Sequence, residues 1–386
     1  MKRKIAIFTT TRAEFGIFCP LIELMSEDEQ LEPLLFVGGT HLVSAFGSTI
    51  NEITDQGFKI KDTFDYVLKE DDCFSISRSL GTACCELAHI FKKYEFDFVC
   101  VLGDRFELLS IISNAIIFKK PIIHISGGER TAGVIDDQVR HMISKAAHLH
   151  FVSCDEYADN LFKMGEPEER IHNTGALNVD NMKRSNKISK LQLFKELNLD
   201  VYRPTVLMCY HPVTLEFSIS LDRQLENLFD ALESFNLQVV ITAPNVETDR
   251  NKIVSFLKKK VALNRNIHYF NSLGFKRYHS LIACCEFVIG NSSSGISEVP
   301  FFKIPTVNIG DRQKGRKRHE SVIDTDYSTE SIKSGIEKAL SEEYKTSLHN
   351  MEYKFGDGHA AEKMICAIKN IEITKEFLQK KLNFVN

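Results

Sequence analysis

The sequence predicts an α/β protein with two lobes, and three observations support this fold class. Short apolar runs typical of strands alternate with amphipathic stretches typical of helices along nearly the whole chain. This alternation occurs twice, in halves of similar length separated by a polar stretch. The length of 386 residues also suits two domains. We therefore expect two Rossmann-like lobes with parallel sheets, and a ligand site in the cleft between them.

The first half contains a regular series of expected elements. Each expected strand is a short run of apolar residues, and each expected helix has apolar positions at helical spacing. We expect strands at 4–9, 34–37, 58–64, 98–102, 121–125 and 150–152, and helices at 15–25, 50–53, 75–94, 108–118 and 136–147.

The alternation weakens between about residues 173 and 190, where Gly, Asn, Ser, Lys and Arg gather, and this stretch is expected to be a linker. The pattern then resumes. We expect strands at 205–209, 238–242, 267–270, 287–289 and 306–309, and helices at 221–235, 254–261 and 328–340, with a long terminal helix at 360–382.

Composition argues against several classes of function. The net charge of −4 and the pI of about 6.4 give no reason to expect a nucleic acid or an anionic membrane as partner. No apolar run approaches the ~20 residues of a membrane helix, and no signal-peptide core follows the N-terminus. The ten cysteines, without a C-x-x-C pair, are expected to be buried reduced thiols of a cytoplasmic protein. No Cys/His cluster has zinc spacing, so no metal is expected.

Charged residues gather where two expected strands of the first half end, which is where open α/β sheets place their ligands. Asp104 and Arg105 follow the strand at 98–102, and the arginine can lower the pKa of the acid or reach a phosphate. A helix cap is the alternative for Asp104. Glu129 and Asp136 come after the next strand, and the Gly-Gly pair before Glu129 lets backbone approach a ligand.

Arg140 and His141 fall within one helical turn of Asp137, so these three side chains are expected to lie close together. The alternative is a solvated helix face. Arg12 lies where the first strand meets the first helix, a place that can hold an anion, and His41 follows the second strand. A helix cap with a solvated arginine, and a structural histidine, are the respective alternatives.

The second half offers a phosphate loop at residues 290–295, Gly-Asn-Ser-Ser-Ser-Gly, which follows a strand and opens a short helix. It lacks the lysine of a P-loop, so ATP hydrolysis is not expected. Glu298, just beyond this loop, could hold ribose hydroxyls. His211 follows another strand and is presented by a turn that Pro212 stiffens, and Arg312 supplies a further cation.

Taken in order, these motifs resemble the UDP-N-acetylglucosamine 2-epimerase family, in its hydrolysing branch, nearly end to end. The motifs that carry the resemblance are Thr-Arg12-Ala-Glu, Gly-Thr-His41-Leu, Gly-Asp104-Arg105-Phe-Glu, Gly-Gly-Glu129, Asp136-Asp-Gln-Val-Arg140-His141, His211-Pro-Val-Thr, Gly-Asn-Ser292-Ser293-Ser-Gly with Glu298, Gly-Asp-Arg312-Gln and Gly-Asp-Gly358.

The resemblance implies the glycosyltransferase-B (GT-B) fold. It implies an N-terminal lobe at 1–175 with the acid and base groups, a nucleotide-binding lobe at 176–365, and a helix at 366–386 that packs back on the first lobe. The implied reaction hydrolyses a UDP-2-acetamido sugar with inversion at C2, through a 2-acetamidoglycal-like intermediate. No cofactor is implied, and relatives often form homodimers or homotetramers.

The resemblance also assigns roles to residues. Asp104 and Asp136 match catalytic carboxylates and His211 matches an active-site histidine, while many relatives carry Glu where this chain has Ser126. Glu129, Asp104 or Asp136 must then supply the missing acid, or the substrate differs. The other matches are expected to bind substrate or nucleotide: Arg12, His41, Arg105, Arg140, His141, Ser292, Ser293, Glu298 and Arg312.

The sequence looks closest to the legionaminic-acid branch of this family. The implied substrate is UDP-N,N'-diacetylbacillosamine, and the product is 2,4-diacetamido-2,4,6-trideoxymannose. The alternative is UDP-N-acetylglucosamine, which would give N-acetylmannosamine for sialic acid biosynthesis. Two other classes remain open: a glycosyltransferase of the same fold, and an inactive protein that binds UDP-sugars.

Overall fold

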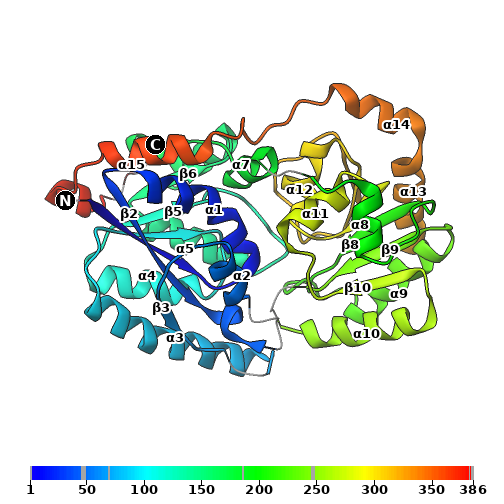
Figure 1. The fold of residues 1–386 in the computed structure, drawn as a ribbon, viewed down its shortest axis with the longest axis horizontal. Helices are drawn as coiled ribbons and strands as arrows, with labels where there is room; N and C mark the ends of the chain where they lie inside the picture. The colour runs from blue at the N-terminus through cyan, green and yellow to red at the C-terminus, as the bar shows by residue number, and fades with distance from the viewer. Residues whose placement is uncertain are drawn as a thin grey trace. The chain divides into compact units, whose positions relative to one another are not determined.

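The computed structural model describes residues 2–44, 49–67, 70–184, 187–244, 248–381 and 383 (Figure 1). The chain divides into two compact units, each with a parallel sheet of its own. The first unit comprises Met1–Glu129, Asp136–Arg184 and Phe355–Asn386, and the second comprises Arg130–Ile135 and Ser185–Lys354. The predicted α/β class with two parallel sheets is confirmed.

The first unit is built on a seven-stranded sheet in the order β3-β2-β1-β4-β5-β6-β7, in which every pairing is parallel. Its strands are β1 (Arg3–Thr9), β2 (Leu31–Gly38), β3 (Ile60–Phe64), β4 (Phe98–Leu102), β5 (Ile122–Ile125), β6 (Leu149–Val152) and β7 (Ile171–Asn173). Its helices are α1 (Arg12–Glu27), η1 (Gly39–Leu42), α2 (Ile50–Asp55), α3 (Cys73–Lys93), α4 (Leu108–Ile117), α5 (Asp136–Ala146), α6 (Asp155–Lys163), η3 (Glu168–Arg170), α7 (Leu177–Arg184), α15 (Ala360–Asn370) and α16 (Lys375–Leu378).

The second unit has a six-stranded parallel sheet in the order β10-β9-β8-β11-β12-β13. Its strands are β8 (Thr205–Cys209), β9 (Gln238–Thr242), β10 (Ile267–Phe270), β11 (Phe287–Gly290), β12 (Thr306–Ile309) and β13 (Val322–Thr325). Its helices are α8 (Lys190–Glu196), α9 (Leu221–Glu233), α10 (Arg250–Leu263), α11 (Gly274–Ile282), α12 (Ser294–Ser297), η4 (Val299–Phe302), α13 (Thr329–Leu340), α14 (Glu342–Ser347) and η5 (Leu348–Asn350).

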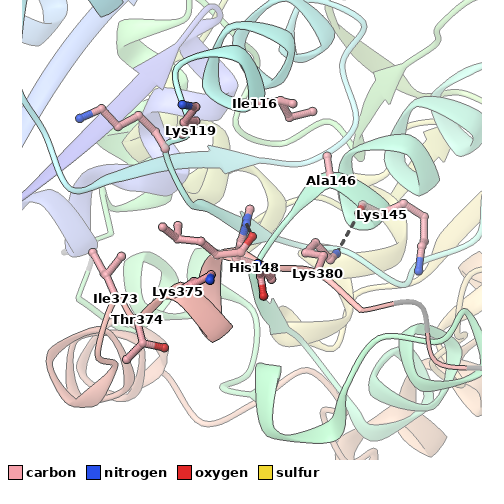
Figure 2. A pocket seen from close by; sticks show the side chains of 12 residues that line it. Ile116, Lys119, Lys145, Ala146, His148, Ile373, Thr374, Lys375 and Lys380 are labelled. Atoms are coloured by element: carbon pink, nitrogen blue, oxygen red, sulfur yellow. Dashed lines mark hydrogen bonds between the residues drawn. The ribbon is translucent and has the colours of Figure 1, made fainter.

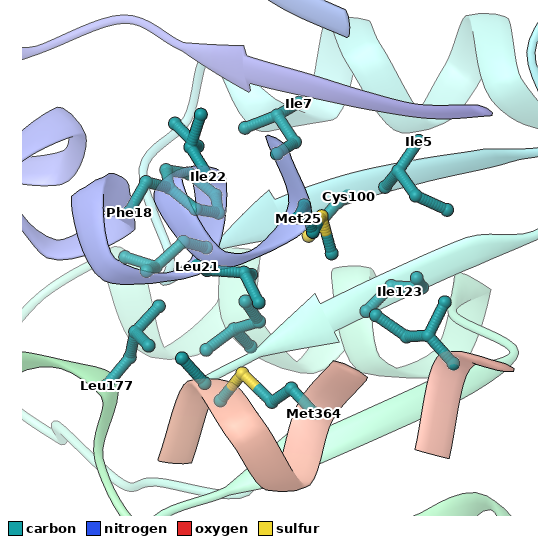
Figure 3. Close-up of a cluster of buried hydrophobic side chains, with 14 of the residues drawn as sticks. Ile5, Ile7, Phe18, Leu21, Ile22, Met25, Cys100, Ile123, Leu177 and Met364 are labelled. Carbon is teal, nitrogen blue, oxygen red and sulfur yellow. The ribbon is translucent and has the colours of Figure 1, made fainter. Parts of the chain in front are cut away.

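Both faces of the first sheet are covered, so its strands bury every second side chain on each side. In β1, Ile5 and Ile7 face one core, which is completed by α1 and α15. Figure 3 shows these side chains together with Met364 of α15. Ala6 and Phe8 face the opposite core, which α3, α4 and α5 cover. The near-continuous apolar runs of the sequence follow from this two-sided burial.

The stretch expected to be a linker, about residues 173–190, contains the helix α7, and the chain passes to the second unit within it, after Arg184. Its polar residues are buried because they have specific partners. Asp180 accepts hydrogen bonds from the backbone N–H groups of Ala360 and Ala361, at 3.0 and 2.8 Å, and so caps the start of α15. Asn181 donates to the carbonyl of Gly16. The first unit therefore continues to Arg184, beyond the boundary expected at 175.

The long terminal helix expected at 360–382 is also wrong, since α15 ends at Asn370 and α16 begins at Lys375. The residues between them include two isoleucines and a threonine, whose β-branched side chains are stiff in a helix. Thr374 caps α16 by accepting a hydrogen bond from the N–H of Phe377, at 3.1 Å. The C-terminal segment that belongs to the first unit begins at Phe355, not at 366.

Residues 130–135, here called the strap, belong to the second unit although both neighbouring segments belong to the first. The N–H of Ala132 donates to the carbonyl of Lys314 at 3.0 Å, and the N–H of Leu215 donates to the carbonyl of Gly133 at 3.2 Å. A side chain on Gly133 would lie 2.6 Å from the carbonyl oxygen of Asp311, which leaves room only for glycine. The strap is therefore closely packed.

Two further expectations can be checked in the described part of the chain. It contains no helix long and apolar enough to cross a membrane. The cysteines are all free, but only Cys100, Cys154, Cys209 and Cys285 are buried, and Cys73, Cys85 and Cys366 are exposed. The expectation of generally buried thiols is therefore wrong, because cysteine on the polar face of a helix such as α3 still lies in an apolar stretch of sequence.

Candidate active site

The turn after β4 carries Asp104 at the carboxyl end of the first sheet. Gly103 adopts a left-handed conformation with φ of 85°, and its N–H donates to the carbonyl of Ile125 in the neighbouring strand β5, at 2.9 Å. The turn that presents Asp104 is thus fixed to the next strand. This location agrees with the expected ligand edge of an open α/β sheet.

Arg140 in α5 joins the candidate acids of the first unit. Its side chain is only 1% exposed. The guanidinium contacts the carboxylate of Asp104, lies 3.3 Å from Asp137 Oδ1, and donates to the carbonyl of Glu129 at 3.1 Å. The predicted proximity of Asp137 and Arg140 is therefore observed. Because Arg140 is buried, its guanidinium fixes the positions of these neighbouring groups.

Asp136 is the first residue of α5, where the helix dipole favours a negative charge, and is half-buried. His141 is 37% exposed and its Nε2 lies 3.3 Å from Asp137 Oδ2. Glu129 is 8% exposed, in the loop that follows β5. The structure therefore gathers Asp104, Glu129 and the start of α5 around one buried cation.

The Gly127-Gly128 pair is packed closely against neighbouring parts of the first unit, and the expectation that its backbone approaches a ligand stays a prediction. A Cβ at Gly128, whose φ is 78°, would lie 2.2 Å from the carbonyl oxygen of Tyr157 in α6. A Cβ at Gly127 would lie 3.0 Å from His124 Nδ1. Ser126, where the resemblance implies Glu, is itself in the left-handed region with φ of 68°.

The turn after β1 contains Arg12 and a buried carboxylate. Arg12 opens α1, and its Nη1 lies 3.7 Å from Glu52 Oε1 in a half-exposed pair. Glu14 Oε2 accepts hydrogen bonds from the N–H and the hydroxyl of Thr10, at 2.7 and 3.1 Å. Thr11 caps α1 through the N–H of Glu14. The helix-cap alternative is thus observed here, together with an arginine that is one-third exposed.

His41 is fully buried, and both ring nitrogens have partners. Nε2 lies 3.2 Å from Thr9 Oγ1, and Nδ1 lies 2.8 Å from Thr49 Oγ1. Burial, with a smaller effect from Arg12, lowers the pKa of His41 to about 4. The structural alternative for this histidine therefore fits the observed contacts, since its ring holds the turns after β1 and β2.

A second acidic cluster links the turns after β1 and β4. Arg105 Nη2 lies 2.6 Å from Glu107 Oε1, and both side chains are largely buried. Burial raises the pKa of Glu14 to about 7, hydrogen bonding by Thr10 and the charge of Arg105 oppose this rise, and the charge of Glu107 adds to it. A carboxyl group that titrates near neutral pH is therefore present beside the candidate phosphate-binding arginine.

In the second unit, His211 and Arg312 are fixed by Asn291. The N–H of His211 donates to Asn291 Oδ1 at 2.7 Å, and Asn291 Nδ2 donates back to the carbonyl of His211 at 2.8 Å. Arg312 is 5% exposed and donates to the carbonyls of Pro212 and Asn291, at 3.3 and 3.4 Å. These contacts join the loops that follow β8, β11 and β12.

The predicted phosphate loop follows β11 as expected. Ser292 Oγ accepts a hydrogen bond from the N–H of Ser294 at 3.4 Å, and Ser293 precedes the short helix α12. Both hydroxyl-bearing residues are half-buried. Glu298 Oε2 lies 2.7 Å from His279 Nε2, which leaves its carboxylate 18% exposed and held in place.

Sequence reasoning missed three residues that organise these groups: Glu14, His279 and Asn291. Glu14 lies three residues after Thr11, which is the spacing of a capping box and could have pointed to it. Asn291 lies inside the predicted phosphate loop and was not distinguished from its serines. Nothing in the sequence pairs His279 with Glu298, because that contact depends on how α11 packs beside α12.

A pocket of about 670 Å³ lies elsewhere in the first unit (Figure 2). It is formed by the ends of α4 and α5 and by the segment around α16, and its lining includes Lys119, Lys145, His148, Lys375 and Lys380. His148 immediately precedes β6, so the pocket adjoins the amino ends of the strands. Asp104 follows the opposite, carboxyl end, and the candidate site is therefore not this pocket.

Chemically, the first unit offers carboxylates for proton transfer beside fixed cations, and the second offers hydroxyls, backbone amides and a buried guanidinium for a nucleotide. Within the described residues, no group of three or more His, Cys, Asp or Glu side chains could hold a metal ion. The expectation that the two lobes enclose the site stays a prediction.

Comparison with known proteins gives a consistent result. The family model described as UDP-N-acetylglucosamine 2-epimerase matches residues 23–369. The GDP/UDP-N,N'-diacetylbacillosamine 2-epimerase (hydrolyzing) of Campylobacter jejuni is 37% identical over 346 residues, which are 89% of each chain. The UDP-N,N'-diacetylbacillosamine 2-epimerase (hydrolyzing) of Legionella pneumophila is 30% identical over 380 residues, 98% of this chain and 99% of that protein.

A solved structure shares the fold. The UDP-GlcNAc 2-epimerase from Neisseria meningitidis, bound to UDP-GlcNAc, superposes with a TM-score of 0.80 at 17% identity. The match covers 95% of this chain and all of that one.

Proposed function

Because the chain belongs to the UDP-N-acetylglucosamine 2-epimerase family, we propose that it is a hydrolysing 2-epimerase acting on UDP-N,N'-diacetylbacillosamine. Its products are 2,4-diacetamido-2,4,6-trideoxymannose and UDP, for legionaminic acid biosynthesis. The observation that carries the proposal is that two relatives, 37% and 30% identical and matched over 89% and 99% of their lengths, are named as hydrolysing 2-epimerases of N,N'-diacetylbacillosamine nucleotides, the first with GDP or UDP and the second with UDP. We also propose that the protein is cytoplasmic and that it forms a homodimer or homotetramer.

The proposed reaction has two steps. A base removes the proton from C2 while the bond between C1 and the pyrophosphate oxygen breaks, and UDP leaves with the electron pair. In the 2-acetamidoglycal that forms, water then adds its oxygen to C1 and a proton returns to C2 from the opposite face. The configuration at C2 is inverted, which requires two proton-transfer groups on opposite faces of the sugar.

Asp104, Glu129 and Asp136 are the proposed proton-transfer groups. The contacts of Arg140 with Asp104, with the carbonyl of Glu129 and with the first turn of α5 support their acting together. Ser126 cannot replace a carboxylate as a base of comparable strength. Glu129, which lies in the same loop and is largely buried, is the proposed substitute.

The proposed nucleotide-binding residues are Ser292, Ser293, Glu298 and Arg312, and His211, which also belongs to the second unit, is a proposed catalytic residue. Hydroxyls and backbone amides at the start of a helix suit a pyrophosphate, and a carboxylate such as Glu298 suits ribose hydroxyls. Arg12 and Arg105 are proposed to stabilise the negative charge of the departing UDP. His141 is proposed as a substrate contact, while His41 and Arg140 act through the side chains that they fix.

The experiment that tests this proposal incubates the protein with each UDP-sugar in D₂O and follows the products by NMR. We expect free UDP, a mannose-configured product with deuterium at C2, and the faster rate with UDP-N,N'-diacetylbacillosamine. A faster rate with UDP-N-acetylglucosamine would establish the alternative substrate. Transfer of the sugar to an added acceptor would indicate a glycosyltransferase, and absence of UDP release from either sugar would refute the proposed activity.

A further inference from the structure

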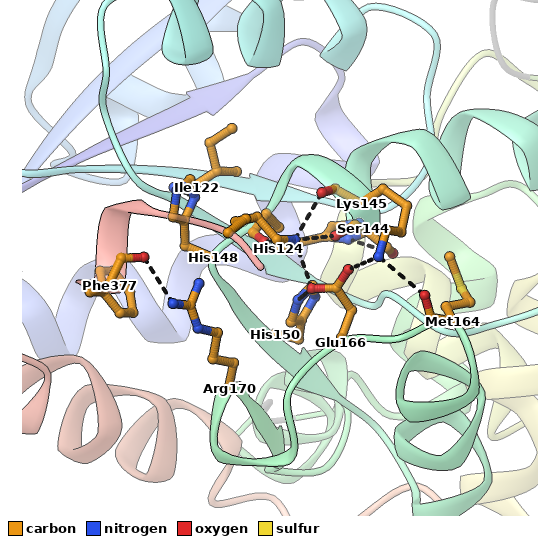
Figure 4. A network of polar contacts seen from close by, with 12 residues as sticks. Ile122, His124, Ser144, Lys145, His148, His150, Met164, Glu166, Arg170 and Phe377 are labelled. Carbon is orange, nitrogen blue, oxygen red and sulfur yellow. Dashed lines mark hydrogen bonds and ion pairs between the residues drawn. The ribbon is translucent and has the colours of Figure 1, made fainter. Parts of the chain in front are cut away.

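His124 is a fully buried histidine at the point where three segments of the first unit meet (Figure 4). It is the third residue of β5. Its Nε2 lies 2.8 Å from the carbonyl oxygen of Gly103, the residue that precedes Asp104. Its Nδ1 lies 3.1 Å from the hydroxyl of Ser144 in α5. The imidazole therefore bridges the Asp104 turn and the helix that begins at Asp136.

The loop that leads to Glu129 packs against the same hydrogen bond. A side chain at Gly127 would place its Cβ 3.0 Å from His124 Nδ1 and 3.0 Å from Ser144 Oγ. The backbone of Gly127 thus closes over the pair of side chains with no space to spare. His124 consequently contacts each of the three segments that carry a candidate acid.

The contacts of His124 define its tautomer. A carbonyl oxygen can only accept a hydrogen bond, so Nε2 must carry the proton toward Gly103. Nδ1 must then accept from the hydroxyl of Ser144. Burial lowers the pKa of His124 to about 3, its hydrogen bond to Gly103 opposes this, and the nearby His150 and Lys380 lower it further. The ring is therefore neutral over the range in which enzymes of this kind are assayed.

Arg140 joins the same three segments, but through different groups. It holds the side chains of Asp104 and Asp137 and the carbonyl of Glu129, whereas His124 holds the backbone of the Asp104 turn and the middle of α5. The two residues together fix both the positions of these segments and the directions of their acids. His124 itself contacts none of the candidate acids' side chains in these hydrogen bonds.

We propose that His124 is a positioning residue of the 2-epimerase reaction, which sets the relative placement of Asp104, Glu129 and Asp136 through its Nε2–H tautomer. This inference rests on the proposed function, because it assumes that those acids transfer protons. A displacement of about 1 Å between groups that act together can lower a rate about 10²-fold. The role belongs to the chemical step and not to nucleotide binding, for which the proposed residues Ser292, Ser293, Glu298 and Arg312 lie in the second unit.

The first test is independent of any substrate. Nitrogen-15 NMR of the imidazole, assigned with the His124→Gln variant, should show a protonated Nε2 and an unprotonated Nδ1. The signals should stay unchanged between about pH 5.5 and 8.5. The opposite tautomer, or a titration within this range, would overturn the proposal. If the wild-type protein released no UDP from either sugar, the proposed function would be refuted. The NMR measurement would still test the tautomer and hydrogen bonds of His124.

The second test compares three variants with wild-type protein by kcat, KM and the Kd for UDP. His124→Leu keeps the volume of the side chain but removes its hydrogen-bond donor. It should lower kcat about 10²-fold and leave KM and the Kd for UDP within about twofold of the wild-type values. His124→Gln retains an N–H that can reach Gly103, so its kcat should be at least about tenfold higher than that of His124→Leu. Ser144→Ala removes only the second hydrogen bond and should lower kcat about fivefold. His89→Leu, at an exposed position of α3, is the control and should change nothing.

Each outcome decides for or against the proposal. A folded His124→Leu protein with wild-type kcat would overturn it, and so would a His124→Gln protein as impaired as His124→Leu. Equal losses in kcat and in UDP affinity would indicate a general structural role instead. If His124→Leu fails to fold, the Ser144→Ala and His124→Gln proteins still decide, because each leaves one of the two hydrogen bonds in place.

Discussion

The buried guanidinium of Arg140 shows how much a single residue can contribute to a site without facing a ligand. Spacing along the helix placed Asp137, Arg140 and His141 together correctly, because residues three and four apart share a face. It could not indicate that this face turns Arg140 toward Asp104 and leaves His141 partly exposed. That distinction depends on how α5 packs on the sheet, which sequence spacing does not contain.

Removal of the Asp104 charge tests the residue that the sequence singled out first. Asp104→Asn keeps the size of the side chain but cannot accept a proton, so turnover should fall at least about 10³-fold. Binding of UDP should be retained within about threefold, because the substitution leaves Arg12, Arg105 and the proposed nucleotide-binding residues of the second unit in place. Initial rates and calorimetric titration with UDP check both expectations. Asp159→Asn, at an exposed position of α6, is the matched control, and full activity of Asp104→Asn would refute the role of Asp104.

Arg140→Met should both abolish activity and destabilise the first unit. The change leaves Asp104 and Asp137 without their shared buried cation, which we expect to cost about 3 kcal/mol. Thermal unfolding measures this loss. The control is Arg223→Met, because Arg223 pairs with Glu226 on the surface, at 3.3 Å and 62% exposure, and should contribute less than about 0.5 kcal/mol. Equal thermal stabilities of the two variants would contradict the structural account of Arg140.

For single residues, the sequence predicted the position in the fold better than it predicted the contacts of the side chain. Asp104, Glu129 and Asp136 follow strands as expected, because the carboxyl ends of parallel strands share one edge. His41 illustrates the limit. Its position after β2 suggested a ligand contact, whereas its partners Thr9 and Thr49 come from other segments and fill both ring nitrogens.

At the scale of elements, the C-terminal segment secures the end of α5. The ammonium group of Lys380 donates to the carbonyls of Lys145 and Ala147 and lies 2.6 Å from the buried Glu166. A cation at this position satisfies carbonyls that a helix end leaves without partners, and it also complements the helix dipole. Sequence reasoning extended α15 through this residue, because apolar spacing alone could not reveal the break after Asn370.

Lys380→Met should therefore loosen the last turn of α5. We expect a loss of about 2 kcal/mol, because Glu166 keeps Lys145 and His150 as partners and the freed carbonyls lose theirs. Faster hydrogen exchange of amides in α5 and a lower Tm check this expectation. Lys363→Met removes a half-exposed pair with Asp357 and serves as the control. Unchanged exchange in α5 would show that the ammonium does not secure the helix.

Across the whole molecule, buried histidines determine how stability responds to acid. Burial lowers the pKa of His41 to about 4, of His124 to about 3 and of His319 to about 4, from an ordinary value of 6.5. Between these values the unfolded chain binds a proton that the folded chain does not, so stability falls as the pH falls. Glu14, with its pKa raised to about 7 from 4.5, acts in the opposite direction over a similar range.

The Tm should accordingly fall as the pH is lowered from about 6.5 to 4.5, because these three histidines, together with His148, whose pKa burial lowers to about 4, outweigh one glutamate. Each histidine contributes up to roughly 1.4 kcal/mol per pH unit. Thermal scans across this range measure the slope. His319→Gln should flatten it, and above pH ~7 the difference in Tm between wild-type and variant should no longer change with pH. A Tm that is constant or that rises toward pH ~5 would contradict the prediction.

The overall architecture was the most predictable feature, since buried parallel strands and amphipathic helices each have a local pattern. Both central sheets were expected, and the family resemblance is confirmed. The boundary between the two units was harder to predict from the sequence. The polar residues of α7 resemble a linker until Asp180 is seen to cap a helix that begins at Ala360, far along the chain.

The strap has a consequence for attempts to separate the two units. The chain passes from one unit to the other after residues 129, 135, 184 and 354, so no single cut releases either of them intact. A fragment ending at residue 184 would retain the strap but lack Lys314 and Leu215, whose backbone groups form hydrogen bonds with it. A gene for either unit alone must therefore be redesigned, and the strap is the piece that would have to be replaced by a new loop.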